Sequence, residues 1–205
     1  MKKTVQNRIF DRIRYNGKNW VFSQKDFARD FSRWEIDHSL YFLEKDGKIK
    51  RILSGLYYYP EYSEILKETV APDMRKVAEA LARKYDWKIF PEGNTVLNYL
   101  GLSTQVPAKY IYISSGSPRK YKISGVDLEF RHRVLTESMI KNENAMLAVQ
   151  AIKSMGQVHS DDNFVKALSK RFPHDEWVKI EKASGKVASW ILDIIRKAAG
   201  YSKNG

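Results

Sequence analysis

The segment from Ser23 to Pro60 constrains the fold of this chain more than any other part of the sequence. Two stretches with helical character begin at hydroxyl side chains, Ser23 and Ser32, and such side chains commonly cap the first backbone N–H groups of a helix. The second stretch ends at Asp46-Gly47 and leads into a basic strand pattern, a Ser54-Gly55 turn and a tyrosine-rich strand pattern. This order of helix, turn, helix and hairpin predicts a winged helix-turn-helix.

The second predicted helix has two different faces. Ile36, Leu40 and Leu43 recur at helical spacing and form the expected buried stripe. A recognition helix enters the major groove with its N-terminal part leading. At about 100° per residue, the outward side of this helix is therefore expected to contact base edges and phosphates. The residues expected to make these contacts are Arg33, Trp34, His38, Tyr41 and Lys45. For Trp34 and Tyr41 the alternative is packing against the next domain or a dimer partner.

Further candidate contacts flank this helix on both sides. Lys48, Lys50 and Arg51 on the hairpin are expected to contact phosphates or to reach an adjacent groove. The cap at Ser23 leaves free N–H groups that could hold a backbone phosphate, with Lys25 beside them. Together with the outward side of the helix, these residues form the predicted DNA-binding set.

Charge supports an anionic partner for this chain. The 205 residues carry a formal net charge of +12, which favours nucleic acid or an anionic membrane surface as a partner. Residues 1–60 hold 13 Lys and Arg against 7 Asp and Glu, so half of the excess lies in less than a third of the chain. The predicted partner is double-stranded DNA.

Several classes of site are excluded or disfavoured by composition. The chain has no cysteine, which removes disulfides, thiolate metal sites and thiol catalysis, and its four histidines are scattered without metal-ligand spacing. We therefore expect no metal and no cofactor. No signal peptide follows the first residues, and no stretch approaches the roughly 18 apolar residues of a membrane span, so we expect a cytoplasmic protein without a membrane partner.

The predicted fold class is α+β, with the winged helix-turn-helix followed by a mixed α/β domain that has a helical C-terminal part. The predicted domains are 1–60, a linker at 61–72 with a short helical turn, and 73–205. Helices are expected at 5–15, 73–85 and 94–100, and strands at 20–22, 87–90, 108–114, 121–123 and 126–131. Further helices are expected at 137–155, 161–170, 176–182 and 186–199.

Two motifs resemble a known family. The first is Gly-Leu-Tyr-Tyr-Tyr-Pro at 55–60, and the second is Phe-Pro-Glu-Gly-Asn-Thr-Val-Leu-Asn-Tyr-Leu-Gly-Leu-Ser-Thr-Gln-Val-Pro at 90–107. The strand pattern at 108–114 and the basic segment at 119–122 are also similar. In these features the chain resembles, over roughly residues 1–155, the AbiEi-type antitoxins of type IV toxin–antitoxin (abortive phage infection) systems.

The resemblance implies a winged helix that binds the promoter of its own operon and represses it. It also implies that the following domain counters a cognate toxin, usually a nucleotidyltransferase-like protein, without a stable complex between the two. No catalytic residue is implied, so we expect no enzyme activity. Because winged-helix repressors often use paired half-sites, a homodimer on DNA is a further expectation. The helices after Met155 have no counterpart in the resemblance.

Two other interpretations stay open. A metal-dependent nucleotidyltransferase would use the Gly116-Ser117 turn for phosphate, and Asp127 and Glu129, two residues apart on one side of a strand, for Mg²⁺. The basic intervening segment looks like a hairpin, where that chemistry needs a helix. A pure interaction protein would instead use a second basic surface that binds DNA, RNA or the toxin, unless it is only solvated. That surface comprises Arg119, Lys120, Lys122, Arg131 and Arg133.

Overall fold

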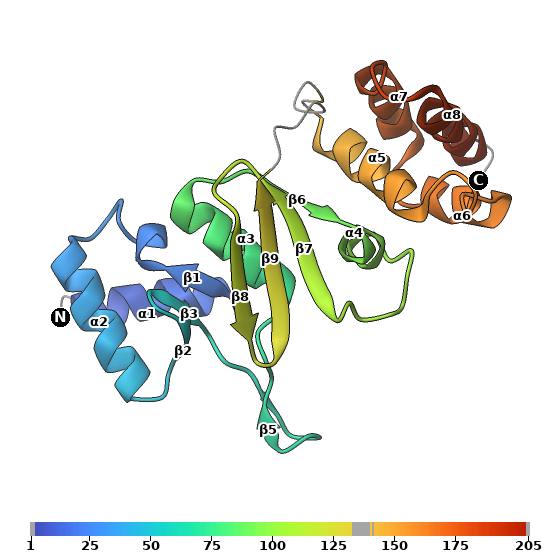
Figure 1. Cartoon of the computed structure of the whole chain (residues 1–205). Helices are drawn as coiled ribbons and strands as arrows, with labels where there is room; N and C mark the ends of the chain where they lie inside the picture. Colours follow the sequence, from blue (N-terminus) through green and yellow to red (C-terminus); the bar gives the residue numbers. More distant parts are fainter. Residues whose placement is uncertain (1–2, 133–139, 141, 204–205) are drawn as a thin grey trace. The chain divides into compact units, whose positions relative to one another are not determined.

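The computed structural model describes residues 3–132, 140 and 142–203, and the chain has an α+β fold with two compact units (Figure 1). The first unit extends through Lys88 and also includes Ile123–Gly125, and the second contains the remainder. This division differs from the predicted one at 61–72, because helix α3 (Met74–Tyr85) groups with the N-terminal elements.

The N-terminal unit is built on a small antiparallel sheet with the strand order β1-β3-β2. Val21 and Lys50 both lie opposite Tyr58, on the two sides of the central strand. Its elements are α1 (Val5–Tyr15), β1 (Val21–Ser23), the 3₁₀ turn η1 (Gln24–Asp26), α2 (Arg33–Lys45), β2 (Lys50–Leu53) and β3 (Leu56–Tyr58). The order is compatible with a winged helix-turn-helix. The predicted helix after Ser23 is only the turn η1, because its capping box is followed by turns and not by further helix.

The core of this unit joins α1, α2 and the sheet. Ile9 and Ile13 of α1 are fully buried, as are Phe22 and Phe27, whose rings meet edge to face with centroids 5.6 Å apart. The predicted stripe of α2 is confirmed, since Ile36, Leu40 and Leu43 are each 1% exposed. Ile49, just before β2, and Tyr57 of β3 belong to the same hydrophobic core.

Helix α3 is fastened to this unit by hydrogen bonds from its last turn. Arg83 donates from Nε to Asp26 Oδ1 at 2.8 Å and from Nη2 to the carbonyl of Val21 at 2.9 Å. Lys84 donates to the carbonyl of Ser54 at 2.7 Å, in the β2–β3 turn. These bonds explain why the compact unit ends after α3 and not before it.

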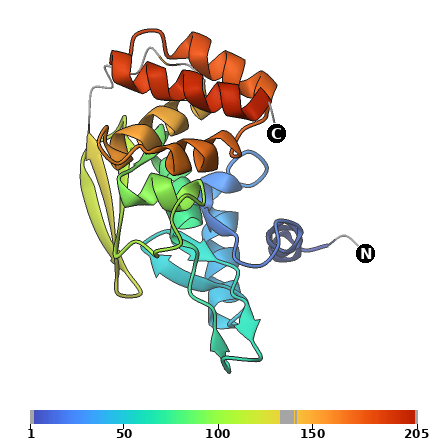
Figure 2. The ribbon, with the colours of Figure 1, turned by 90° about the vertical axis from the view of Figure 1, so that its right-hand side faces the viewer.

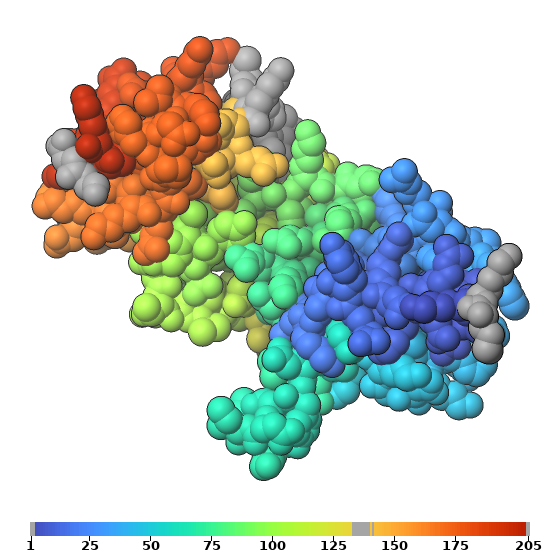
Figure 3. Space-filling view, turned by 180° about the vertical axis from the view of Figure 1, so that it is seen from behind, coloured from blue at the N-terminus to red at the C-terminus, as the bar shows by residue number. Residues whose placement is uncertain are grey.

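Residues 61–72 form a β-hairpin, so the expected helical turn there was wrong. Strands β4 (Tyr62–Ser63) and β5 (Glu68–Thr69) pair antiparallel, with Tyr62 opposite Thr69. The tip closes because Leu66 N–H donates to Ser63 Oγ at 3.1 Å and Lys67 adopts a φ of 54°. The hairpin projects from the surface of its unit, as Figure 3 shows.

The second unit contains a four-stranded sheet with the order β6-β7-β9-β8. Strands β6 and β7 are antiparallel, whereas β7 and β9 are parallel, with Tyr112 opposite Phe130. The elements are β6 (Ile89–Glu92), α4 (Asn94–Tyr99), β7 (Lys109–Ser114), β8 (Arg119–Ile123) and β9 (Val126–His132). Each predicted strand and the short helix of this region is present, with ends that differ by up to two residues.

The remainder of the second unit is helical, and α7 and α8 lie side by side in it (Figure 2). Trp177 is fully buried in the helical core, and its Nε1 donates to the carbonyl of Ser169 at 3.0 Å. The helices are α5 (Glu143–Met155), α6 (Asp162–Ser169), α7 (His174–Ala183) and α8 (Ser189–Lys203). Residues 137–139 and 141 of the predicted helix before α5 lie outside the described residues. No helix in the described part of the chain is long and apolar enough to cross a membrane.

Candidate nucleic-acid interface

Helix α2 begins at a complete capping box. Ser32 N–H donates to Glu35 Oε2 at 2.8 Å, and Glu35 N–H donates to Ser32 Oγ at 3.4 Å. Hydrogen bonding from Ser32 lowers the pKa of Glu35. Because this box satisfies two N–H groups and the apolar stripe faces the core, the outward side of the helix is fixed in orientation.

The outward side of α2 carries an exposed row of aromatic rings. The side chain of Trp34 stacks on His38 with centroids 5.0 Å apart and an interplanar angle of 22°, and Trp34 is 71% exposed. Farther along, Tyr41 is 56% exposed and meets the ring of Phe42 edge to face at 5.2 Å. The predicted exposure of Arg33, Trp34, His38, Tyr41 and Lys45 is confirmed. Their role in DNA binding stays a prediction.

Most cations of the predicted set are paired with carboxylates. The pairs are Lys25 with Asp86, Arg33 with Asp37 at 3.8 Å, Lys48 with Asp46 at 3.1 Å, and Arg51 with Glu44 at 2.8 Å. Among the described residues, Lys45 and Lys50 have no salt bridge, and Lys50 Nζ donates to Thr69 Oγ1 at 2.9 Å. Exposed pairs of this kind contribute little to stability and can open to a phosphate.

Two members of the predicted set are placed differently from the expectation. Ser23 is 1% exposed and its N–H and hydroxyl both donate to Asp26 Oδ2, at 2.8 and 3.2 Å. A carboxylate therefore occupies the position that was expected to receive a phosphate. Arg51 is held by two hydrogen bonds to Glu44, at 3.2 and 2.8 Å, and lies 5.3 Å from the centre of the Tyr57 ring. The hydrogen bonds to Glu44 raise the pKa of Arg51.

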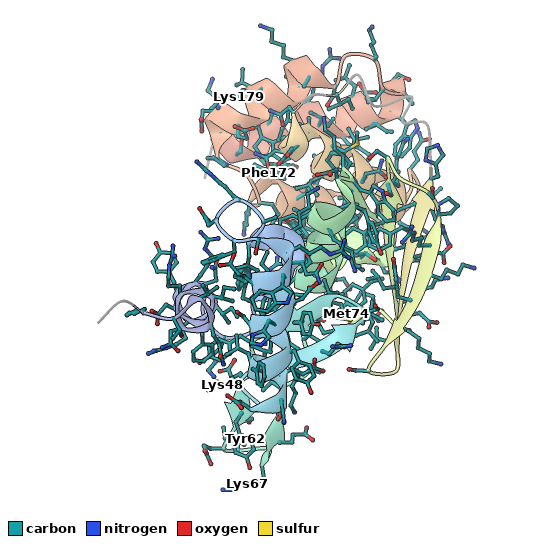
Figure 4. The ribbon with its side chains drawn as sticks, turned by 90° about the vertical axis from the view of Figure 1, so that its left-hand side faces the viewer. Lys48, Tyr62, Lys67, Met74, Phe172 and Lys179 are labelled. Atoms are coloured by element: carbon teal, nitrogen blue, oxygen red, sulfur yellow. The ribbon has the colours of Figure 1, made fainter. Side chains whose placement is uncertain are left out.

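The turn between β2 and β3 does not form an extended wing. Gly55 has a φ of 66°, and Lys84 Nζ would lie 3.1 Å from a Cβ at this position. The projecting β4–β5 hairpin is also unsuited to a phosphate backbone, because Glu61, Glu64 and Glu68 outnumber its one cation, Lys67. Of the hairpin cations predicted to contact phosphate, Lys48 and Lys50 are the two that, in the described part of the chain, lack a double hydrogen bond to one carboxylate. Figure 4 shows Lys48, Tyr62 and Lys67 in succession toward the hairpin tip.

The arginine cluster, defined as Arg8, Arg12, Arg29 and Arg33, adds three arginines that the sequence prediction missed to the predicted Arg33. Arg8 and Arg12 lie on α1, and Arg29 lies in the segment that leads into α2. Arg8 lies 4.9 Å from the centre of the Phe31 ring, just before α2, and its charge helps lower the pKa of Glu35 in the first turn. Arg12 pairs with Asp30 in the same loop. In the described part of the chain, Arg8 and Arg29 form no salt bridge with a carboxylate. The cluster therefore brings positive charge to the N-terminal end of α2.

Counting charged residues over shorter segments of the sequence could have found this cluster. Residues 1–18 hold six Lys and Arg against one Asp, whereas residues 19–60 hold seven against six. Most of the excess charge of the first 60 residues therefore lies in residues 1–18, the segment that contains α1, and not in residues 19–60, which contain the predicted contact residues. Only the packing of α1 against α2 brings Arg8 and Arg12 to the leading end of α2.

The residues of the predicted second basic surface lie on different strands and in different surroundings. Arg119, Lys120 and Lys122 are exposed on β8, an outer strand. Arg131 instead donates to Glu129 Oε1 at 3.0 Å and lies 3.5 Å from Glu92 Oε2. Arg133 lies outside the described residues. The surface therefore reduces to the three cations of β8.

The geometry of the alternative metal site is unfavourable. Glu129 is 9% exposed and is paired with Lys109 and Arg131, and these hydrogen bonds lower its pKa to about 2. Asp127 lies on the same side of β9 but is exposed, and the segment before it is a β-hairpin, as predicted. A carboxylate neutralised by two cations is a poor ligand for Mg²⁺. Among the described residues, no three His, Asp or Glu side chains are grouped closely enough to hold a metal ion.

Comparisons with known proteins give a family but no activity. The crystal structure of the RV2827C protein from Mycobacterium tuberculosis is similar to this chain with a TM-score of 0.45 and 11% sequence identity, over 99% of this chain and 80% of that chain. No curated protein matches the sequence. A family described as being of unknown function, DUF6088, matches residues 8–176. Since this match spans more than half of the sequence, the protein belongs to the DUF6088 family.

Proposed function

We propose that this protein binds double-stranded DNA through α2 and represses transcription of its own operon. The observation that carries the proposal is the arginine cluster at the N-terminal end of α2, next to the exposed outward side of that helix. The N-terminal end of a recognition helix leads into the major groove and lies between the two phosphate backbones. Arg8 and Arg29 are then available for phosphates, and Trp34 and Tyr41 for base edges.

Charge arrangement favours DNA over a purely protein ligand for this surface. Phosphate contacts supply most of the affinity in nonspecific binding, and base contacts supply the specificity. The cluster and the aromatic row place these two kinds of group next to each other on one unit. Lys45 and Lys50, which form no salt bridge in the described part of the chain, add positive charge toward the other end of α2.

The direct test is fluorescence anisotropy of the full chain with a labelled duplex from upstream of its own operon and a scrambled duplex of equal composition. We expect tighter binding to the native duplex and weaker binding as salt rises, because each neutralised phosphate releases about one counterion. Equal binding to both duplexes would leave only a polyanion-binding protein. No binding to either duplex would contradict the proposal.

We further propose that the repressor is the antitoxin of a type IV toxin–antitoxin system, with the second unit countering a nucleotidyltransferase-like toxin. The support for this part is the motif at 90–107, which forms β6, α4 and the loop before β7. The test is growth after induction of the neighbouring toxin gene, with and without the full chain. Continued arrest in the presence of the full chain would contradict the antitoxin role, whatever the result of the DNA assay. A homodimer on DNA would be recognised by two protein chains per duplex in the same titration.

A further inference from the structure

The outward side of α2 offers few groups for hydrogen-bonded base reading. Asn and Gln, which pair with adenine through two hydrogen bonds, do not occur in α2, and Arg33 is its one arginine. Asp37 is engaged by Arg33 and by the side-chain amide of Gln24. The exposed aromatic side chains of this helix are those of Trp34, His38 and Tyr41.

The aromatic row is held in place before any ligand binds. Trp34 is stacked on His38, and the His38 ring lies 4.7 Å from that of Phe42, which Tyr41 also contacts. A ring supported in this way loses little conformational freedom on binding, so its exposed area contributes to affinity at low entropic cost. The aromatic row is therefore a preorganised apolar contact surface.

The two most exposed rings of the row are separated along the helix axis. Trp34 and Tyr41 are seven residues apart, which corresponds to about 10 Å along a helix axis. A helix that lies in the major groove can therefore bring the two rings to different base pairs of one duplex. The apolar feature that the major groove displays is the C5 methyl group of thymine.

We propose that α2 recognises thymine methyl groups in duplex DNA through Trp34 and Tyr41; this inference rests on the proposed DNA-binding function. The cations at the two ends of the row, Arg33 and Lys45, place positive charge on either side of the apolar contact, as a groove bounded by two phosphate strands requires. Double-stranded RNA does not fit this surface, because its deep major groove is closed to side chains and its uracil lacks the methyl group.

The test compares four DNA duplexes of one length that differ in methyl content: alternating A·T, alternating A·U, alternating G·C, and alternating G·C with 5-methylcytosine. Replacing thymine by uracil removes the methyl group and keeps the base pairing, and 5-methylcytosine restores a methyl group at the same place in the groove. One buried methyl group corresponds to about a fourfold change in affinity, so we expect the A·T duplex to bind roughly 4- to 15-fold more tightly than the A·U duplex. The methylated G·C duplex should likewise bind more tightly than the unmethylated one.

The assignment to α2 is tested by the double variant Trp34→Ala/Tyr41→Ala, which should bind the A·T and A·U duplexes equally. The matched control is Tyr62→Ala, a residue 54% exposed on the hairpin, compared with 56% for Tyr41, and it should keep the methyl preference. Equal binding of A·T and A·U by the wild type would overturn the inference and leave the proposed function standing. A preference that persists in the double variant would overturn the assignment to these two rings. Failure to bind all four duplexes would overturn the inference, and failure to bind the duplex from its own operon as well would overturn the proposed function.

Discussion

The two compact units use their positive charge in different ways. In the N-terminal unit, Arg8 and Arg29 form no salt bridge within the described part of the chain and lie near the first turn of α2. In the second unit, Lys109 and Arg131 converge on the buried carboxylate of Glu129. The first arrangement leaves cations available to an anionic ligand, whereas the second uses them to stabilise a sheet. The net charge of a chain therefore indicates a class of partner but does not locate the surface that binds it.

The largest effect is expected from removing Arg8 and Arg29, two cations of the N-terminal unit. We expect Arg8→Ala/Arg29→Ala to weaken duplex binding roughly 10- to 100-fold at 0.1 M salt and to make the log–log salt slope shallower by about two units. Anisotropy titrations at several salt concentrations measure both quantities. The control Lys170→Ala/Lys182→Ala removes the same charge from exposed positions of the second unit. An equal loss in the control would show that only total charge matters.

The second prediction concerns Glu129, the buried carboxylate of the second unit. We expect Glu129→Gln to lower the free energy of unfolding by about 1–3 kcal/mol at pH 7, because Lys109 and Arg131 lose the negative charge between them and one of the two acceptor oxygens. Duplex affinity should be unchanged. Urea unfolding followed by circular dichroism measures the stability. A loss of DNA binding at unchanged stability would contradict the structural assignment.

The same carboxylate predicts a pH dependence. Hydrogen bonds from Lys109 and then from Arg131 lower the pKa of Glu129 from 4.5 to about 2. A lowered pKa means that this stabilising contribution is fully present above about pH 4.5 and is lost as the pH falls toward 2. The difference in stability between wild type and Glu129→Gln should therefore shrink across that window. A difference that stays constant down to pH 2 would show that the pair does not titrate as expected.

A smaller effect is expected from the ion pair that fastens α3 within the N-terminal unit. Asp26 accepts from Ser23 and from Arg83, so Asp26→Ala should lower the free energy of unfolding by about 1–2 kcal/mol. Thermal unfolding measures the change, and Asp26→Asn, which keeps the shape, serves as the control. If Asp26→Ala left the melting temperature unchanged, the hydrogen bonds between α3 and the turn η1 would not contribute to stability. A lower melting temperature would show that the Asp26 carboxylate stabilises the N-terminal unit.

The smallest effect is expected at β8. Lys120→Glu/Lys122→Glu should change the free energy of unfolding by less than about 0.5 kcal/mol, because both side chains are exposed on an outer strand. We expect duplex affinity and antitoxin activity to stay unchanged, as for a solvated surface. A fall in duplex affinity would assign these lysines to DNA, and a fall in growth rescue alone would assign them to the toxin. Either outcome would show that the second unit also has cations available to a ligand.

Local sequence patterns predicted the parts of the fold that depend on neighbouring residues. The periodicity of Ile36, Leu40 and Leu43 correctly gave the buried stripe of α2, and the Ser32 cap correctly gave its start. The segment at 61–72 was predicted wrongly, because the pairing of Tyr62 with Thr69 outweighs a weak helical tendency of the residues between them. The inclusion of α3 in the N-terminal unit also could not be predicted, since Arg83 reaches Asp26 across 57 positions of sequence.

The sequence by itself determined that the chain is basic and α+β, and it determined which residues of α2 face outward, because helical periodicity is a local property. Tertiary structure alone decided which of those charges are paired: it placed a carboxylate at Ser23, tied Arg51 to Glu44, and directed Arg131 to Glu129. It also brought Arg8 of α1 beside the first turn of α2. Electrostatic pairing depends on distances between side chains that are remote in sequence, and only the packing of helices and strands sets those distances.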